Sequence, residues 1–303
     1  MSIPGRFGAL LTAMVTPFDE EGALDLDGAA QLARWMVDNG NDGLVVAGTT
    51  GESPVLSDAE KADLWRAVCE AVTVPVIAGS GTYDTAHSIK LTQIAEEAGA
   101  AGILAVTPYY SRPSQAGLQA HFRAVAGATS LPVMVYDIPG RTGRKISHDV
   151  LVRLARDVEN ITSVKDAAGD PAAAARLLAD GPDHLELYSG DDALTLALLA
   201  IGASGAVSVA GHWTGLLQGQ MMAAFAKGDV DDARRINSML IPSWLFETSD
   251  DAPNPLPAKA MLRVLGLPAG QCRLPMGTAP DGLEDQAREV LAGLGSDAPS
   301  PQH

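Results

Sequence analysis

The stretch Asn160-Ile161-Thr162-Ser163-Val164-Lys165-Asp166-Ala167-Ala168-Gly169-Asp170 is a short apolar strand that ends in a lysine and is followed by small, acidic, turn-forming residues. A helix is expected next, over 171–178, so the stretch opens a strand-and-helix unit. An ammonium group at the end of a buried strand is costly unless its pKa is lowered or it takes part in chemistry. A lysine that has lost its proton can attack a carbonyl and form a Schiff base. The alternative is a solvated surface lysine, the commoner situation of this residue type.

Similar strand-and-helix units are expected along most of the chain. The strands are nearly continuous in Val, Ile, Leu and Ala, as in a parallel sheet covered on both faces. About eight units at regular spacing favour an α/β fold of the (β/α)8 TIM-barrel type over an open doubly wound sheet. The predicted strands cover 7–16, 42–48, 75–78, 102–106, 132–136, 160–165, 185–188 and 205–209.

The predicted organisation has three parts. Residues 1–212 form the barrel, 213–294 form additional C-terminal helices, and 295–303 form a disordered tail rich in Pro, Ser and Asp. The predicted C-terminal helices cover 213–227, 230–245, 257–265 and 282–294.

Composition excludes several classes of function. The 303 residues carry a net charge of −16, which does not suit a nucleic-acid partner. No apolar run is long enough to span a membrane, and the N-terminus lacks the apolar core of a signal peptide. Two cysteines are too few for a disulfide framework, which fits a cytoplasmic location. The six histidines lack metal-ligand spacing, and no dinucleotide, Walker or Gly-x-Ser-x-Gly motif is present, so we expect neither a metal nor a nucleotide cofactor.

Candidate site residues follow the predicted strands, because the active site of a TIM barrel lies at the C-terminal ends of its strands. Hydroxyls and backbone N–H groups of a small-residue turn suit a carboxylate, phenols suit proton transfer, and an arginine suits a second carboxylate. Each group also has an ordinary structural interpretation, as a capping hydroxyl, a packing aromatic or a surface ion pair. The candidates are Thr49, Thr50, Tyr109, Tyr110, Tyr136, Arg141, Lys165, Ser189, Gly190, Asp191 and Ser208.

Lys165 differs from the other lysines in its position. Lys61, Lys90 and Lys259 fall on predicted helices, Lys227 lies at a helix end and Lys145 in a loop; only Lys165 ends a predicted strand. This placement makes the nucleophilic and the surface interpretations about equally good.

Five motifs in the same order carry a resemblance to a known family. The sequence resembles the dihydrodipicolinate synthase / N-acetylneuraminate lyase family of Schiff-base aldolases over about 7–294. The motifs are Gly48-Thr49-Thr50-Gly51-Glu52, Thr107-Pro108-Tyr109-Tyr110, Tyr136-Asp137-Ile138-Pro139-Gly140-Arg141-Thr142-Gly143, Val164-Lys165-Asp166-Ala167-Ala168-Gly169-Asp170 and Ser189-Gly190-Asp191-Asp192.

The resemblance implies a role for each matching residue. Lys165 would form an imine with pyruvate, and Tyr136 would donate and accept protons. Thr49 would link Tyr136 to Tyr110, which in this family comes from a neighbouring subunit. Thr50 would hold the pyruvate carboxylate, with Val207 and Gly190 in the same pocket. Arg141 would bind the carboxylate of L-aspartate 4-semialdehyde, the second substrate of the synthases.

The resemblance further implies a homotetramer built from tight dimers and chemistry without a metal, because the iminium is itself the electron sink. Asp137 and Ala168 depart from the usual Asn and Thr or Ser without removing a proposed functional group. Some relatives bind lysine as a feedback inhibitor through two histidines and an Asn. Asp58, Lys61 and Tyr83 stand in those places here, which argues against such inhibition.

Two alternatives remain open. A sibling pyruvate-dependent aldolase would cleave a 2-keto-3-deoxy sugar acid, for which Arg141 would not be needed. A non-catalytic pyruvate sensor would not need the set Lys165, Tyr136, Thr49 and Tyr110.

Overall fold

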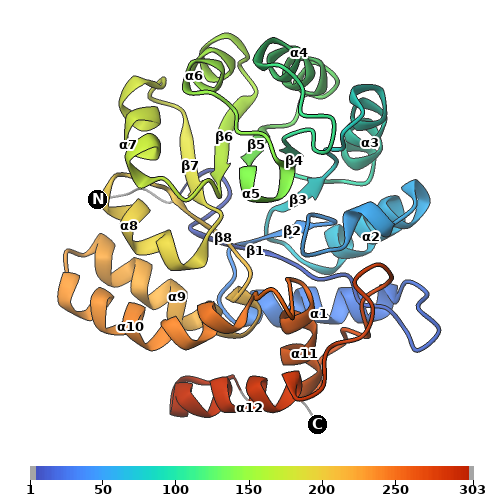
Figure 1. Cartoon of the computed structure of the whole chain (residues 1–303), viewed down its shortest axis with the longest axis vertical. Helices are drawn as coiled ribbons and strands as arrows, with labels where there is room; N and C mark the ends of the chain where they lie inside the picture. The colour runs from blue at the N-terminus through green and yellow to red at the C-terminus, as the bar shows by residue number, and fades with distance from the viewer. Residues whose placement is uncertain (1–4, 300–303) are drawn as a thin grey trace.

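Eight parallel strands pair in sequence order and close into a barrel, because β1 pairs with both β2 and β8. The computed structural model describes residues 5–299, and Figure 1 looks onto the barrel with its ring of helices. The predicted (β/α)8 barrel with additional C-terminal helices is therefore confirmed. The strands are β1 (Leu10–Ala13), β2 (Gly43–Val46), β3 (Val76–Gly79), β4 (Gly102–Val106), β5 (Val133–Asp137), β6 (Ile161–Asp166), β7 (Glu186–Ser189) and β8 (Gly205–Ser208).

A helix follows each strand and covers the outside of the barrel. The eighth, α9, lies between α8 and α1 and closes the ring, so the predicted boundary at 212–213 falls near its start (Figure 1). The ring helices are α1 (Leu26–Asp38), α2 (Asp58–Ala71), α3 (Thr85–Glu97), α4 (Gln115–Ala126), α6 (His148–Asp157), α7 (Pro171–Asp180), α8 (Thr195–Ala200) and α9 (Gly211–Ala226).

Side chains at the helix starts explain where several helices begin. A capping box begins α2: Ser57 Oγ accepts a hydrogen bond from the backbone of Glu60 at 3.2 Å, and Glu60 Oε2 accepts one from the backbone of Ser57 at 2.8 Å. Asp25, Asp84 and Asp170 accept backbone hydrogen bonds in the same way at α1, α3 and α7. Local sequence thus defines helix starts around the ring.

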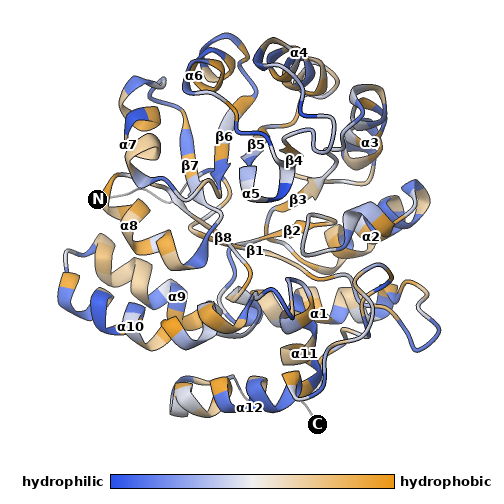
Figure 2. Ribbon diagram, viewed as in Figure 1, coloured by the Kyte–Doolittle hydropathy of each residue, from blue (hydrophilic) through white to orange (hydrophobic). Residues whose placement is uncertain are grey.

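Two layers of apolar side chains hold the barrel together. The inner layer fills the barrel and includes Phe7, Leu11, Ile77 and Met134, while a larger layer lies between strands and helices. Figure 2 shows hydrophobic colours through the strands and hydrophilic stretches on outer helices such as α10 and α12. The barrel is therefore a packed core rather than a channel, with its polar groups left for the rim.

The chain continues beyond the ring with three further helices, α10 (Val230–Phe246), α11 (Leu256–Val264) and α12 (Leu283–Leu294). α10 packs on α9, and α12 packs on α10 and α11. The predicted disordered tail begins with the 3-10 helix η3 (Gly295–Asp297), and Ala298 packs against the core. The last part of that prediction, 300–303, lies outside the described residues.

Short elements at the barrel rim were not predicted from the sequence. The loop after β5 contains one helical turn, α5 (Pro139–Thr142), with proline at its start, and it carries Arg141. The 3-10 helices η1 (Ser53–Val55) and η2 (Asp192–Leu194) follow β2 and β7. These elements shape the rim on which the candidate residues lie.

Candidate active site

Lys165 lies next to the end of β6 with its side chain in the barrel mouth. The strand register places it beside Tyr136 of β5 on one side and Tyr188 of β7 on the other. Its Nζ lies 4.4 Å from the centroid of the Tyr136 ring, and the residue is 4 % exposed. Burial lowers the pKa of Lys165 to about 8, although the negative charge of Asp192 acts to raise it. At neutral pH, part of the Lys165 population is therefore uncharged, and the uncharged amine is the nucleophilic form.

Gly190 leaves the space that the Lys165 side chain occupies. A Cβ at this position would lie 2.9 Å from Cε and 3.0 Å from Cγ of Lys165, closer than atoms normally approach. The Gly190 N–H donates to the carbonyl of Asp166 at 2.7 Å, which fixes the turn after β7 against the lysine strand. A residue without a side chain is thus required for Lys165 to adopt this position.

Tyr136 supplies a buried phenol beside the lysine. Burial raises the pKa of Tyr136 to about 12, while the positive charge of Arg141 and a hydrogen bond with Thr49 act in the opposite direction. The phenol is therefore protonated at neutral pH and available as a proton donor.

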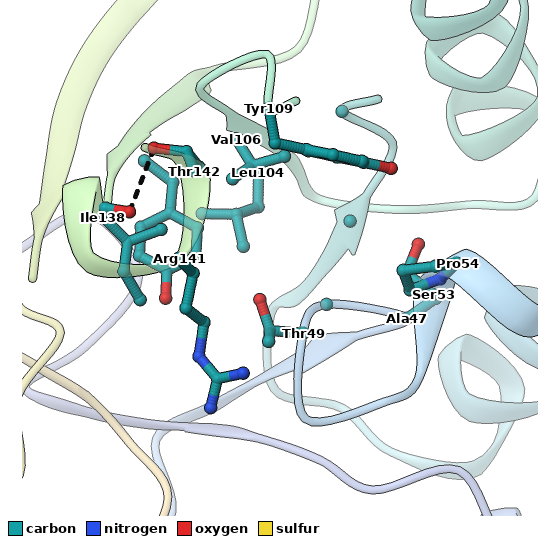
Figure 3. Close-up of a pocket in the computed structure, with 14 residues that line it drawn as sticks. Ala47, Thr49, Ser53, Pro54, Leu104, Val106, Tyr109, Ile138, Arg141 and Thr142 are labelled. Atoms are coloured by element: carbon teal, nitrogen blue, oxygen red, sulfur yellow. Dashed lines mark hydrogen bonds between the residues drawn. The ribbon is translucent and has the colours of Figure 1, made fainter. Parts of the chain in front are cut away.

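A cavity of about 220 Å³ opens beside these groups at the C-terminal ends of β2 to β5. Thr49, Tyr136 and Arg141 are the predicted catalytic and substrate-binding residues on its wall, together with Tyr109 and Leu104. Figure 3 shows Arg141 and Thr49 reaching into the same space from opposite loops. Thr142 donates a hydrogen bond to the carbonyl of Ile138 at 3.0 Å and so closes the turn that carries Arg141 (Figure 3). The cavity can receive a small acid with its carboxylate toward the guanidinium.

Four further predicted residues lie beside this cavity and do not line it: Lys165, Gly190, Thr50 and Val207. Thr50 is 2 % exposed, and its hydroxyl accepts a hydrogen bond from Nδ2 of Asn254 at 2.9 Å. Val207 of β8 belongs to the same inner cluster of the barrel as Tyr136. Thr50 and Val207 are therefore placed around the barrel mouth, on the β2 turn and on β8.

Tyr110, another predicted site residue, is exposed on the surface of this chain and does not line the cavity. It is 94 % exposed, and its φ of +67° is unusual for a residue other than glycine. Tyr109 lines the cavity instead and packs edge-to-face on Tyr83, with ring centroids 5.5 Å apart. The backbone at this point directs Tyr110 away from the subunit's own site.

Sequence reasoning missed a buried ion pair beneath the Thr49–Thr50 turn. Glu52 Oε1 lies 2.7 Å from Nζ of Lys259, and their side chains are only 2 % and 1 % exposed. Lys259 also donates to the carbonyl of Gln271 at 3.0 Å and lies 4.2 Å from the Phe18 ring centroid. Position on a helix concealed this burial, and burial of Lys61, which is 4 % exposed, was missed for the same reason.

A second missed feature is a pair of acids behind Lys165. Asp192 of η2 accepts hydrogen bonds from the backbone of Val209 and Ala210 at 2.8 and 2.9 Å. Burial and the neighbouring Asp192 raise the pKa of Glu247, at the end of α10, well above its usual range. The negative charge of Asp192 raises the pKa of Lys165 and so acts against the lowering caused by burial. Sequence order gives no sign of this pairing, because Glu247 comes from beyond the barrel.

Among residues 5–299, no group of His, Cys, Asp and Glu side chains could hold a metal ion. No helix of the described part is long and apolar enough to cross a membrane.

A barrel whose sixth strand carries a buried lysine of lowered pKa, next to a protonated phenol and a cavity lined by an arginine, defines a site suited to imine chemistry. Residues 6–293 match the model of the dihydrodipicolinate synthetase family, and the chain belongs to this family.

Curated and solved relatives agree with that membership. The chain is 54 % identical over 296 residues to the 4-hydroxy-tetrahydrodipicolinate synthase of Acidothermus cellulolyticus, covering 96 % of this chain and 94 % of the relative. It is 46 % identical over 273 residues to the synthase of Bacillus subtilis, covering 89 % and 93 %. The crystal structure of a dihydrodipicolinate synthase from Bacillus anthracis superposes with a TM-score of 0.91 at 42 % identity, covering 94 % of this chain and 98 % of that one.

Proposed function

We propose that this chain condenses pyruvate with L-aspartate 4-semialdehyde to give 4-hydroxy-tetrahydrodipicolinate, as a lyase of the diaminopimelate and lysine pathway. The observation that carries the proposal is Lys165, buried at the end of β6 with its pKa lowered to about 8 and its Nζ over the Tyr136 ring. The shared name of the curated relatives supports the reaction.

The covalent steps follow from the chemistry of a neutral amine. Nζ of Lys165 attacks the keto carbon of pyruvate, and the carbonyl oxygen leaves as water after it has gained two protons. The resulting iminium acidifies the methyl group, which loses a proton and becomes an enamine. The enamine carbon attacks the aldehyde, whose oxygen takes up a proton. The amine of the semialdehyde then attacks the imine carbon, closes the ring and releases the Lys165 amine.

Protons for these steps pass through Tyr136. Its raised pKa keeps the phenol protonated until a neighbouring group needs the proton, and its position beside Nζ suits both the water loss and the later condensation. Thr49 connects the Tyr136 phenol to Tyr110 at the outside of the barrel mouth. Tyr110 of a second subunit completes the relay, which agrees with its exposure in the single chain.

Two carboxylates are bound at separate points of the site. Thr50, through its hydroxyl and backbone N–H, holds the carboxylate of pyruvate, with Val207 and Gly190 enclosing the bound acid. Arg141 binds the carboxylate of the semialdehyde from the α5 turn that lines the cavity. Arg141 is therefore the residue that separates this function from cleavage of a sugar acid.

The assembly and surroundings of the enzyme are part of the same proposal. A homotetramer, formed as a dimer of dimers, would provide the shared Tyr110. No metal or organic cofactor is needed for the steps above, because the iminium withdraws the electrons. The low cysteine content fits action in the cytoplasm.

Reductive trapping tests the nucleophile. Borohydride added with pyruvate should convert the imine to a stable secondary amine on Lys165, seen as a mass increase of the intact protein and located by peptide mapping. Lys165→Ala should give no adduct, while Lys227→Ala, which changes an exposed lysine, should label like the wild type. Labelling of another lysine would show that Lys165 is not the nucleophile, and no labelling at all would favour a non-catalytic sensor.

Turnover tests the second substrate. The wild type should consume pyruvate with L-aspartate 4-semialdehyde much faster than it cleaves 2-keto-3-deoxy sugar acids. Arg141→Ala should raise KM for the semialdehyde more than KM for pyruvate, because only the former uses the guanidinium. A preference for sugar acids would contradict the synthase assignment.

A further inference from the structure

Asn254 connects the C-terminal region to the turn that holds pyruvate in the proposed function. It lies two residues before α11 and is 7 % exposed. Its Nδ2 donates to Oγ1 of Thr50 at 2.9 Å, across 204 positions of sequence. Its backbone carbonyl accepts a hydrogen bond from Arg141 at 3.5 Å. One residue thus contacts both side chains assigned to the two substrate carboxylates.

The hydrogen bond to Thr50 restricts what the Thr50 hydroxyl can do. A threonine hydroxyl has one proton to donate and two lone pairs to accept with. Asn254 occupies one lone pair as a donor, so the hydroxyl proton must point elsewhere. Within residues 5–299 the Thr50 hydroxyl makes no hydrogen bond as a donor. The free proton therefore remains available to a carboxylate bound beside the turn that carries Thr50.

The contact is held from both sides. The backbone N–H of Asn254 donates to Oγ1 of Thr248 at 3.3 Å, and α11 starts directly after Pro255. One turn into that helix, Lys259 forms its 2.7 Å ion pair with Glu52, two residues after Thr50. Two contacts therefore join the turn after β2 to the start of α11: the Asn254–Thr50 hydrogen bond and the Lys259–Glu52 ion pair. The ion pair helps to hold Asn254 next to Thr50.

We propose that Asn254 is a positioning residue that directs the Thr50 hydroxyl proton toward the carboxylate of pyruvate. The proposal rests on the function proposed above and adds a residue outside the barrel to its substrate recognition. Asn254 therefore affects binding of the carboxylate next to the reacting carbonyl, and it does not affect binding of the carbonyl itself.

Comparing two ketones separates this role from a structural one. Pyruvate and acetone both form an imine that borohydride can trap, but acetone has no carboxylate. Asn254→Ala should raise the half-saturating pyruvate concentration about tenfold, which corresponds to roughly 1.4 kcal/mol. The half-saturating acetone concentration should change by less than about twofold, because acetone has no carboxylate to accept the Thr50 hydrogen bond. Asn39→Ala removes an amide that only caps α1 and should change neither.

A double variant tests whether Asn254 acts through Thr50. Thr50→Val should weaken pyruvate trapping by itself, and Asn254→Ala should then add little further loss. Asn254→Asp has the same size but takes the Thr50 proton as an acceptor, so it should weaken pyruvate more than Asn254→Ala does. If Asn254→Ala fails to fold, the comparison of pyruvate with acetone can be made with Asn254→Asp instead.

The outcomes separate this inference from the function on which it rests. Equal losses for pyruvate and acetone, or additive losses in the double variant, would overturn the role of Asn254 alone. A wild-type protein that traps no pyruvate on Lys165 would overturn the proposed function and this inference together.

Discussion

Gly190→Ala is expected to damage catalysis while leaving the fold intact. The added Cβ would lie 2.9 Å from Cε of Lys165, whereas carbon atoms in contact are about 3.5–4.0 Å apart. Relief of this contact moves the lysine tail by roughly 0.6–1 Å. A misplacement of about 1 Å at a reacting atom costs on the order of 100-fold in rate. The same Cβ would lie 3.0 Å from Cβ of Ala167, but the closest contact is with the flexible end of the lysine side chain, so the thermal midpoint should change little.

The assay follows both the overall reaction and the first covalent step. We expect kcat with pyruvate and L-aspartate 4-semialdehyde, and the rate of borohydride trapping, to fall together on the order of 100-fold. Gly219→Ala is the matched control, because a Cβ there meets nothing within 4 Å. Wild-type rates in the Gly190→Ala enzyme would show that Lys165 does not need this space for catalysis. Loss of the thermal transition would show that the damage is to folding.

Three further predictions concern Lys165, the buried ion pair of Glu52 and Lys259, and Tyr110. Because only neutral Lys165 reacts and its pKa is about 8, the trapping rate should rise about tenfold per pH unit below pH 8 and level off above it; a continued rise to pH 10 would contradict the lowered pKa. Glu52→Gln leaves Lys259 buried without its partner and should cost about 3–5 kcal/mol in chemical denaturation, against about 0–1 kcal/mol for the exposed Lys90→Met. Tyr110→Phe and Lys165→Ala subunits should each be nearly inactive but regain activity when refolded together, and no gain on mixing would place Tyr110 outside the neighbouring site.

The alternation of apolar strands and capped helices was enough to predict the barrel, because each unit is defined by residues close together in the sequence. The strand β4 has the predicted bounds, and side chains next to the helix starts cap α1, α2, α3 and α7. The barrel topology also predicted that the end of β6 would lie in the mouth, which is where Lys165 is found. Local pattern and a known topology together place this residue.

Contacts between distant parts of the chain could not be predicted in this way. Asn254 and Lys259 reach the turn after β2 because the chain beyond the barrel folds back over the rim, and no local pattern records that path. A lysine on a helix reads as a surface charge until its partner is known, and Glu52 lies more than two hundred positions away. The same limit applies to Glu247 beside Asp192.

The ties between the β2 turn and α11 have a consequence for synthesis of the enzyme. A nascent chain that has produced all of its strands, up to Ser208, still lacks Asn254 and Lys259. At about 5–20 residues per second the ribosome needs roughly 2–9 s more to reach Asn254. During this interval the barrel can close with the turn after β2 untethered and Glu52 without a counter-ion. Newly made barrels should therefore become competent for substrate only as the last helices emerge.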